Sequence, residues 1–310
     1  MITSLHHVTA TVAHAQEDVD FYTKLLGLRL VKRTVNFDNR GVYHFYYGDA
    51  RGTPGSIMTT FPYAGMGVRT GVKGAGQITA TAFRVPSESL DFWRDRLVRH
   101  DVSVEERERR FGEEVIAFTD PSGLILEIVS GGDDRTASWV TDGIDADAAI
   151  LTIHGVTLEI RDPVPTFELL QDGLGLKVTG REDNRTRVQA GSTEPAHVLD
   201  VLHVPDGPAG VNGIGTVHHV ALAIKTEDEQ LAVQEELRRK GFNVTDVRDR
   251  QYFRSIYFRE PGGVLLEVAT EGPGFLIDEP EDALGRSLKL PPWEEPRRSE
   301  IAAALPPIEV

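Results

Sequence analysis

Two internal repeats divide the chain into copies of one structural module. Residues 120–129 (DPSGLILEIV) align with residues 260–269 (EPGGVLLEVA) at an offset of 140 positions, and residues 5–9 (LHHVT) align with residues 153–157 (IHGVT) at an offset of 148. Such repeats constrain the fold strongly, because each copy is expected to form the same supersecondary unit. The four copies lie at residues 5–61, 77–130, 151–204 and 215–270.

The first module predicts a β-α-β-β-β unit. Residues 5–12 alternate between apolar and polar side chains as in a strand, and residues 17–26 carry apolar side chains at helical spacing before Gly27. Three further strands are predicted at residues 28–34, 43–47 and 56–61. We therefore expect an α+β fold in which four such modules pair into two domains with curved mixed sheets. The predicted parts are an N-terminal domain (1–135), a C-terminal domain (148–271) and a proline-rich arm (272–310).

The arm is predicted from its composition. The last forty residues hold seven prolines, and nine acidic residues against four basic ones, so this segment cannot build a core of its own. Leu288 and Trp293 favour an arm that packs on the domains over a disordered tail.

Charge and composition limit the partners. The chain has 33 basic and 48 acidic residues, a formal charge of −15, which argues against nucleic acid or an anionic membrane surface as a partner. There is no cysteine, so thiolate nucleophiles and cysteine metal sites are excluded. No signal peptide or membrane span is recognised. These features predict a cytoplasmic protein, and they are compatible with a homo-oligomer.

Histidines recur in the first strand of the modules. Aligning the four copies places His7, Thr79, Gly155 and His219 at one position. A buried imidazole within an apolar strand costs free energy unless a partner satisfies it, and a metal ion is such a partner. Modules one and four are therefore the candidates for metal binding.

Carboxylates recur in the last strand. The second and fourth modules carry Glu127 and Glu267 there. Glu127 has no histidine in its own module, so we interpret it as structural, and His7, His219 and Glu267 remain as a set. Two imidazoles and one carboxylate are the ligands of non-haem Fe(II) oxygenases, which keep open positions for substrate and O2. A structural zinc site would instead be closed by four ligands and would usually include cysteine.

The motifs together resemble one protein family. The modular pattern is similar to the vicinal oxygen chelate superfamily, and more narrowly to its hydroquinone-type (chlorohydroquinone) ring-cleaving dioxygenases. The resemblance extends over the whole chain and rests on residues 5–9 (LHHVT), 43–49 (YHFYYGD), 52–55 (GTPG), 76–80 (GQITA), 217–221 (VHHVA) and 290–296 (LPPWEEP).

The resemblance implies a function and a set of site residues. It implies Fe(II), with Mn(II) as the alternative ion, and insertion of both atoms of O2 next to a hydroxylated carbon of a small aromatic diol. The family's metal ligands match the set His7, His219 and Glu267. Its catalytic residues around the metal match His6, Thr9, His218, Arg250 and Tyr257.

Other interpretations stay open at this stage. Strand alternation points His6 and His218 away from the metal, and His154 occupies the His6 position in a module without a metal set, so these histidines could be structural. An extradiol catechol dioxygenase is a second functional hypothesis. A glyoxalase-like isomerase or thiol transferase is a third, although residues 56–60 (SIMTT) lack the further carboxylate it needs. A metal-free binding protein is the fourth. The histidines interpreted as incidental are His14, His44, His100, His197 and His203.

Overall fold

Two eight-stranded mixed sheets form the body of the protein in the computed structural model. The structure describes residues 1–131, 139–191 and 196–310, so the predicted end of the N-terminal domain at residue 135 lies outside the described residues. The expected α+β fold with curved mixed sheets in two domains is confirmed.

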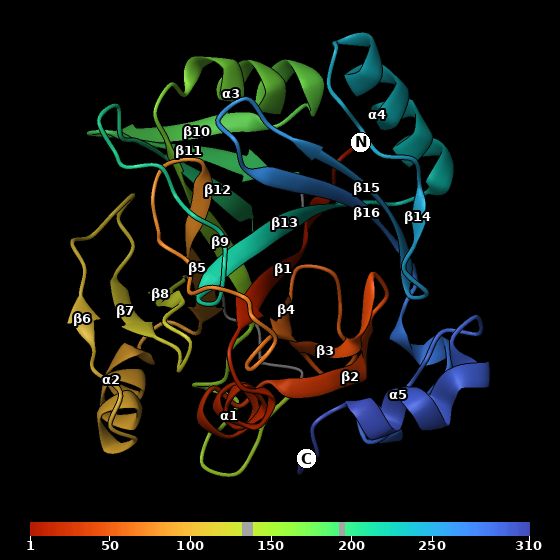
Figure 1. Cartoon of the computed structure of the whole chain (residues 1–310). Coiled ribbons are helices and arrows are strands. Elements are labelled where there is room, and N and C mark those ends of the chain that lie inside the picture. Colours follow the sequence, from red (N-terminus) through yellow and green to blue (C-terminus); the bar gives the residue numbers. More distant parts are fainter. Residues whose placement is uncertain (132–138, 192–195) are drawn as a thin grey trace.

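The first sheet holds the strands of modules one and four, in the order β14-β15-β16-β13-β1-β4-β3-β2. In Figure 1 these strands are red to orange and teal to blue. Their bounds are β1 Ser4–Val12, β2 Arg29–Asn36, β3 Asn39–Gly48, β4 Ile57–Pro62, β13 Thr216–Ile224, β14 Arg248–Asp249, β15 Phe253–Arg259 and β16 Leu265–Pro273.

The second sheet holds the strands of modules two and three, in the order β10-β11-β12-β9-β5-β8-β7-β6. In Figure 1 these strands run from orange for β5 through yellow to green. Their bounds are β5 Gln77–Val85, β6 Glu105–Glu106, β7 Val115–Thr119, β8 Ile125–Ser130, β9 Thr152–Ile160, β10 Lys177–Glu182, β11 Arg185–Ala190 and β12 His197–His203.

The pairing of modules differs from the predicted grouping in chain order. Module one shares its sheet with module four through antiparallel pairing of β1 with β13, and module two shares its sheet with module three through β5 and β9. The grouping into 1–135 and 148–271 therefore does not describe the sheets. The glycine-rich connectors, 63–76 and 204–215, also contact each other, with bridges from Thr70 to Ile214 and from Val72 to Val211.

Helices cover one face of each sheet. In module four, Thr226 caps α4 by accepting a hydrogen bond from the backbone N–H of Glu229 at 3.2 Å, as is typical of threonine at a helix N-terminus. Gln230 of α4 then donates to the backbone oxygen of Val268 at 2.8 Å, so this helix lies against the face of β16 opposite to that of Glu267. The helices are α1 Ala15–Asp20, α2 Leu90–Arg99, α3 Val164–Glu168, α4 Glu227–Arg239 and α5 Arg298–Ala304, and α1 and α3 continue as one π-helical turn each.

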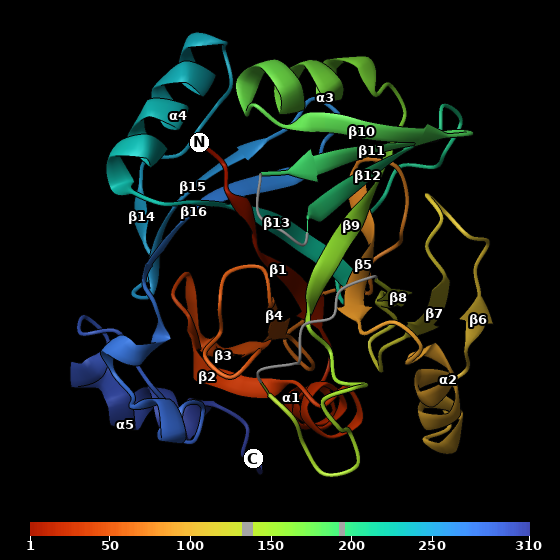
Figure 2. The ribbon, with the colours of Figure 1, turned by 180° about the vertical axis from the view of Figure 1, so that it is seen from behind.

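After β16 ends at Pro273, the rest of the chain forms an arm along β2 and β3 of module one, visible in both ribbon views (Figures 1 and 2). Lys32 of β2 is fully buried beneath it, and its ammonium lies 2.6 Å from Asp278 and 2.5 Å from Glu279. Trp293 of the arm meets the ring of Phe37 edge to face, with centroids 5.6 Å apart. The arm thus packs against the sheet that holds modules one and four.

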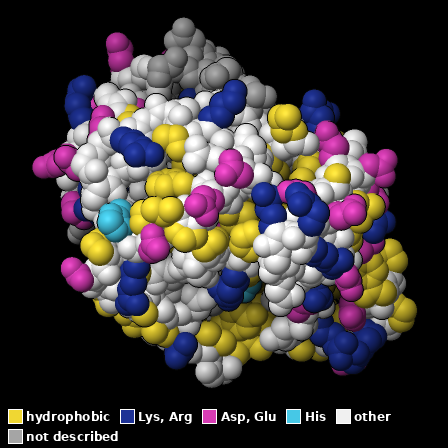
Figure 3. Space-filling model, turned by 90° about the horizontal axis from the view of Figure 1, so that it is seen from above, with side chains coloured by type: hydrophobic (Ala, Val, Ile, Leu, Met, Phe, Trp, Pro, Cys, Tyr) yellow, Lys and Arg dark blue, Asp and Glu magenta, His cyan; other side chains and the backbone are white. Residues whose placement is uncertain are grey.

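Acidic and basic side chains are interspersed over the face drawn in Figure 3, and neither sign covers it alone. Among the residues that the structure describes, none of the helices is long and apolar enough to cross a lipid bilayer.

Candidate active site and metal centre

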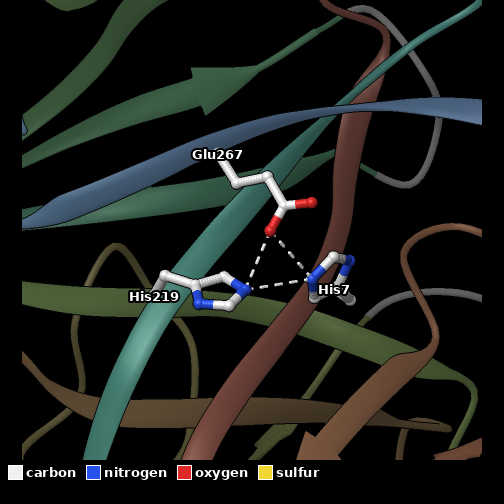
Figure 4. A group of neighbouring side chains, drawn as sticks. All are labelled: His7, His219 and Glu267. Atoms are coloured by element: carbon white, nitrogen blue, oxygen red, sulfur yellow. Dashed lines mark hydrogen bonds and ion pairs between the residues drawn. The ribbon is translucent and has the colours of Figure 1, made fainter. Parts of the chain in front are cut away.

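Three neighbouring strands bring His7, His219 and Glu267 together. His7 lies on β1, His219 on β13 and Glu267 on β16. The β1–β13 register pairs Thr9 with His219, and the β13–β16 register pairs Ala221 with Glu267. Side chains two residues apart on a strand share a face, so all three groups point to one side of the sheet, as Figure 4 shows.

The donor atoms of the three side chains form a compact triangle. The two imidazole Nε2 atoms lie 3.2 Å apart, and Oε2 of Glu267 lies 3.4 Å from Nε2 of His7 and 2.9 Å from Nε2 of His219. Donors bound at about 2.1 Å to one ion at right angles would be about 3 Å apart. These separations fit one metal ion on one face of an octahedron, which leaves its other positions open.

A buried carboxylate lies at the centre of this arrangement. Glu267 is fully buried, its Oε2 faces the Nε2 atoms of His7 and His219, and Ser255 donates a hydrogen bond to its Oε1. Burial alone would raise the pKa of Glu267, but His7 and His219 hold it well below its ordinary value. Burial lowers the pKa of His219, so its imidazole is neutral and has a lone pair for a metal. The donor set fits a divalent cation.

The neighbouring histidines do not follow the predicted alternation. Two β-bulges interrupt the β1–β13 pairing, and the extra residues are His6 and His218. A bulge re-aims side chains locally. Nδ1 of His6 lies 2.9 Å from Nδ1 of His7, and Nδ1 of His218 lies 2.7 Å from Nδ1 of His219. Each bulged histidine therefore contacts Nδ1 of a candidate ligand, which is the ring nitrogen that does not face the metal position.

The two bulged histidines differ in exposure. His218 lines the cavity beside the triad, which corrects the expectation that it points away. His6 is buried and packs on the ring of Phe253, with centroids 4.8 Å apart. Burial lowers the pKa of both imidazoles to about 3. Both rings are therefore neutral, and each can hold the orientation of its neighbour.

Arg250 and Tyr257 lie together on the cavity wall. Nε of Arg250 donates to the Tyr257 hydroxyl at 3.0 Å, and Nη2 donates to Asp38 of module one, also at 3.0 Å. Tyr257 is itself edge-to-face with His219, with centroids 5.7 Å apart. Burial, then Glu267, raises the pKa of Tyr257. The structure thus brings a permanent cation and a neutral phenol beside the metal position.

Thr9 does not line the cavity but connects to residues that do. Its hydroxyl accepts a hydrogen bond from Thr59 at 2.8 Å, and Oγ1 of Thr59 lies 3.0 Å from Nε2 of His44. The hydroxyl of Tyr46 is 2.9 Å from Nδ1 of the same histidine. His44 and Tyr46 both line the cavity. His44, interpreted from the sequence as incidental, thus lies on the cavity wall within a hydrogen-bonded chain.

The cavity beside the triad has a volume of about 430 Å³. The triad residues and the polar groups around them form part of its wall, and the β2–β3 turn at residues 36–39 forms part of its rim. Such a mixture of aromatic surface and a few placed polar groups is typical of small-molecule sites. Its apolar and aromatic lining is Phe37, Tyr46, Phe61, Tyr63, Phe253, Tyr257 and Leu265.

The second sheet repeats the geometry with other residues. Strand register places Ala80 opposite Thr157, as His219 lies opposite Thr9, and Thr79 is the extra residue of a bulge. The alignment of Thr79 with His219 was therefore wrong by one position, because the offset of 140 holds for the last strands and not for the first. Gly155 does occupy the position of His7, where a Cβ atom would meet the backbone oxygen of Val198 at 2.3 Å.

In the second sheet, ion pairs occupy the place that corresponds to the three candidate ligands of the first sheet. Glu127 forms a buried ion pair with Arg110, which agrees with its interpretation as structural. Asp200 of β12 corresponds to Thr59 of module one. Asp200 pairs with Thr157 and Thr59 pairs with Thr9. Each of these threonines lies two residues after the aligned position, which is Gly155 or His7. Sequence alignment missed this carboxylate. Arg187 pairs with Asp200 through two guanidinium nitrogens, at 2.8 and 3.0 Å.

Both halves of the chain are similar to one known protein family. Residues 4–128 and 152–268 match the family model described as Glyoxalase/Bleomycin resistance protein/Dioxygenase superfamily. The "Putative ring-cleaving dioxygenase MhqO" of Bacillus subtilis is 43% identical over 306 residues, which are 99% of this chain and 96% of that protein. The "Chlorohydroquinone/hydroquinone 1,2-dioxygenase" of Sphingobium indicum is 36% identical over 308 residues, 97% and 95% of the two chains. A crystal structure titled as a putative dioxygenase from Bacillus subtilis has a TM-score of 0.95 at 42% identity, and covers 100% of this chain and 98% of that one.

Proposed function

The chain belongs to the Glyoxalase/Bleomycin resistance protein/Dioxygenase superfamily, and from that premise we propose that it is an Fe(II)-dependent ring-cleaving dioxygenase acting on a hydroquinone-type aromatic diol. One observation carries the proposal: two imidazoles and one carboxylate converge on a cavity large enough for a substituted aromatic ring. The similarity to ring-cleaving dioxygenases over nearly the whole chain supports the same reaction class.

The residues of the chain have distinct roles in this proposal. His7, His219 and Glu267 would hold the ion, which supplies Lewis acidity and open positions for the diol and O2. His6 and His218 orient the ligand imidazoles through the Nδ1 contacts. Arg250 holds the charge of a ring hydroxylate. The hydroxyl of Tyr257, which accepts from Arg250, can donate its proton to a substrate oxygen.

Fe(II) is preferred over the alternative Mn(II) because a site of two histidines and one carboxylate is the characteristic site of non-haem iron oxygenases. A glyoxalase-like reaction is less well supported. The place in module one that corresponds to Glu267 is taken by Thr59, which pairs with Thr9 as Glu267 pairs with Ala221. A hydroxyl there does not replace the further carboxylate.

Oxygen uptake tests the proposal directly. The protein is loaded with Fe(II) without oxygen and mixed with hydroquinone, methylhydroquinone, chlorohydroquinone or catechol, and uptake and product absorbance are followed after O2 is admitted. We expect uptake with the hydroquinones. Uptake with catechol alone would place the protein among extradiol catechol dioxygenases, and no uptake with any ring would refute the dioxygenase proposal.

A substitution tests the ligand set separately. His219→Ala should abolish both iron binding and turnover, measured as iron per chain after anaerobic purification and as oxygen uptake. His203→Ala, on the exposed end of β12, is the matched control and should retain both. Retention of iron by His219→Ala would contradict its assignment as a ligand.

A further inference from the structure

A chain of hydrogen bonds runs from the cavity wall into module one. It links the hydroxyl of Tyr46 to Nδ1 of His44 at 2.9 Å and Nε2 of His44 to Thr59 at 3.0 Å, and Thr59 donates to Thr9 at 2.8 Å. Both ring nitrogens of His44 are thus occupied within the protein. Tyr46, at the end of the chain, lines the cavity, as does His44.

The chain fixes the polarity of this end. A neutral imidazole has one N–H and one acceptor nitrogen, and a hydroxyl has one proton to donate. Because Thr59 donates its proton to Thr9, it accepts from the Nε2–H of His44, and Nδ1 of His44 then accepts from Tyr46. The oxygen of Tyr46 is left to accept from a ligand hydroxyl. Burial raises the pKa of Tyr46 and lowers that of His44, so both groups stay neutral.

Packing from the arm fixes the ring of Tyr46. Phe275 of the arm meets it edge to face, with centroids 5.0 Å apart, and Tyr252 lies 6.1 Å away. The ring centroid of His44 lies 4.1 Å from that of Tyr46. A phenol held in this way is pre-organised for binding.

The second sheet shows what these positions become without a metal set. By strand register, Arg185 and Arg187 occupy the positions of His44 and Tyr46, and Asp200 occupies that of Thr59. The guanidinium groups of both arginines reach Asp200. A set of neutral hydrogen-bonding groups open to a cavity is therefore a property of the sheet that carries His7, His219 and Glu267.

We propose that Tyr46 is a substrate-binding residue that recognises the second ring hydroxyl of a diol, with His44 and Thr59 as positioning residues. The inference rests on the proposed function, in which Arg250 and Tyr257 of module four receive the other, metal-directed hydroxyl. Tyr46 lies on β3 of module one, so the two hydroxyls of the substrate would be read by groups from different modules. The chemical class selected is an aromatic ring with two oxygen substituents, in preference to a monophenol of the same shape.

Anaerobic binding to the Fe(II)-loaded protein tests this inference. The ligands are hydroquinone and 4-methylphenol, in which a methyl group replaces one hydroxyl at similar size. We expect the wild-type protein to bind hydroquinone about tenfold more tightly, the effect of one neutral hydrogen bond. Tyr46→Phe should weaken hydroquinone binding about tenfold and leave 4-methylphenol binding unchanged, so the preference falls to about one.

Two further variants separate recognition from folding. Thr59→Val leaves Nε2 of His44 without its partner and should lower the preference about threefold with unchanged 4-methylphenol binding, whereas a merely structural role would weaken both ligands. Tyr43→Phe is the matched control, because Tyr43 lies on the opposite face of the same strand and donates to the backbone oxygen of Pro306 at 3.0 Å. It should keep the wild-type preference.

The outcomes distinguish the two proposals. A wild-type preference that persists in Tyr46→Phe, or a wild-type protein without any preference, overturns the role of Tyr46. Binding of hydroquinone with a Tyr46-dependent preference but without oxygen uptake would overturn the dioxygenase proposal and leave the recognition of the second hydroxyl intact.

Discussion

Replacing Lys32 by methionine should destabilise the protein more than any exposed ion-pair substitution. The ammonium of Lys32 has no solvent exposure, and it lies 2.6 Å from Asp278, 2.5 Å from Glu279 and 3.2 Å from the backbone oxygen of Phe275. Methionine fills a similar volume but has no charge. The substitution therefore leaves two carboxylates of the arm without their cation.

The magnitude follows from how these carboxylates are buried. Glu279 is 4% exposed, and the removal of one partner from a buried ion pair costs about 3–5 kcal/mol. The side chain of Asp278 is 21% exposed and also accepts from Tyr252 at 3.0 Å, so water and the phenol compensate part of its loss. We expect the free energy of unfolding to fall by about 3–4 kcal/mol.

Urea unfolding of the iron-loaded protein at pH 7 measures the effect, provided that fluorescence and circular dichroism give coincident transitions. Lys24→Met is the matched control. Lys24 lies 2.7 Å from Asp20 in an exposed pair, and its loss should cost less than about 1 kcal/mol.

A second substitution tests the cause. Adding Glu279→Gln to Lys32→Met removes the unpaired carboxylate, and the amide can still contact Ser287, which now donates to Glu279 at 3.0 Å. The double variant should recover part of the lost stability. A loss below about 1 kcal/mol for Lys32→Met, or no recovery in the double variant, would refute the argument that the ammonium is needed to compensate buried charge.

Three other substitutions test single residues. Glu127→Gln should leave iron content unchanged but lower stability by about 3 kcal/mol, because Arg110 loses its buried partner; loss of iron would show that Glu127 serves the metal. Arg250→Lys should keep iron and lower turnover at least tenfold, since one ammonium cannot reproduce the fork that now contacts Tyr257 and Asp38; unchanged turnover would argue against its role. Burial raises the pKa of Asp18 from 3.8 to about 7, so the stability that its protonated form supplies is complete below about pH 4 and is lost as the pH rises through 7. The free energy of unfolding falls by at most about 4 kcal/mol over this range. Asp18→Asn should remove this pH dependence, measured by urea unfolding at pH 5 and 8. An unchanged pH dependence in the variant would contradict the assignment to Asp18.

The internal repeats predicted most of the fold and the three candidate ligands. The offset of 140 between the last strands of modules two and four aligned Glu127 with Glu267, and the histidine pattern then selected His7 and His219. The structure brings these three side chains together. The pairing of modules could not be read in the same way, because every module begins with a similar strand whose free edge can pair with any other first strand.

The placement of the residues around the triad depends on strand bulges and on which face of a strand is toward the metal position, and sequence patterns do not show either. Alternation predicts which side chains share a face, but a bulge at His218 in the β1–β13 pairing turns this side chain into the cavity. His44 and Tyr46 alternate correctly on β3, yet nothing in the sequence states which face of that strand is toward the metal position. The motif at residues 43–49 was the available signal for them.

The shared sheet of modules one and four has a consequence for synthesis on the ribosome. His7 and His219 are 212 residues apart, and Glu267 comes another 48 positions later (267 − 219). During synthesis, the second sheet can therefore form before His219 and Glu267 have been translated, and His7 has neither partner until then. Closing so long a loop is entropically costly and slow, so capture of the ion should be among the last events of maturation, after the fourth module has docked.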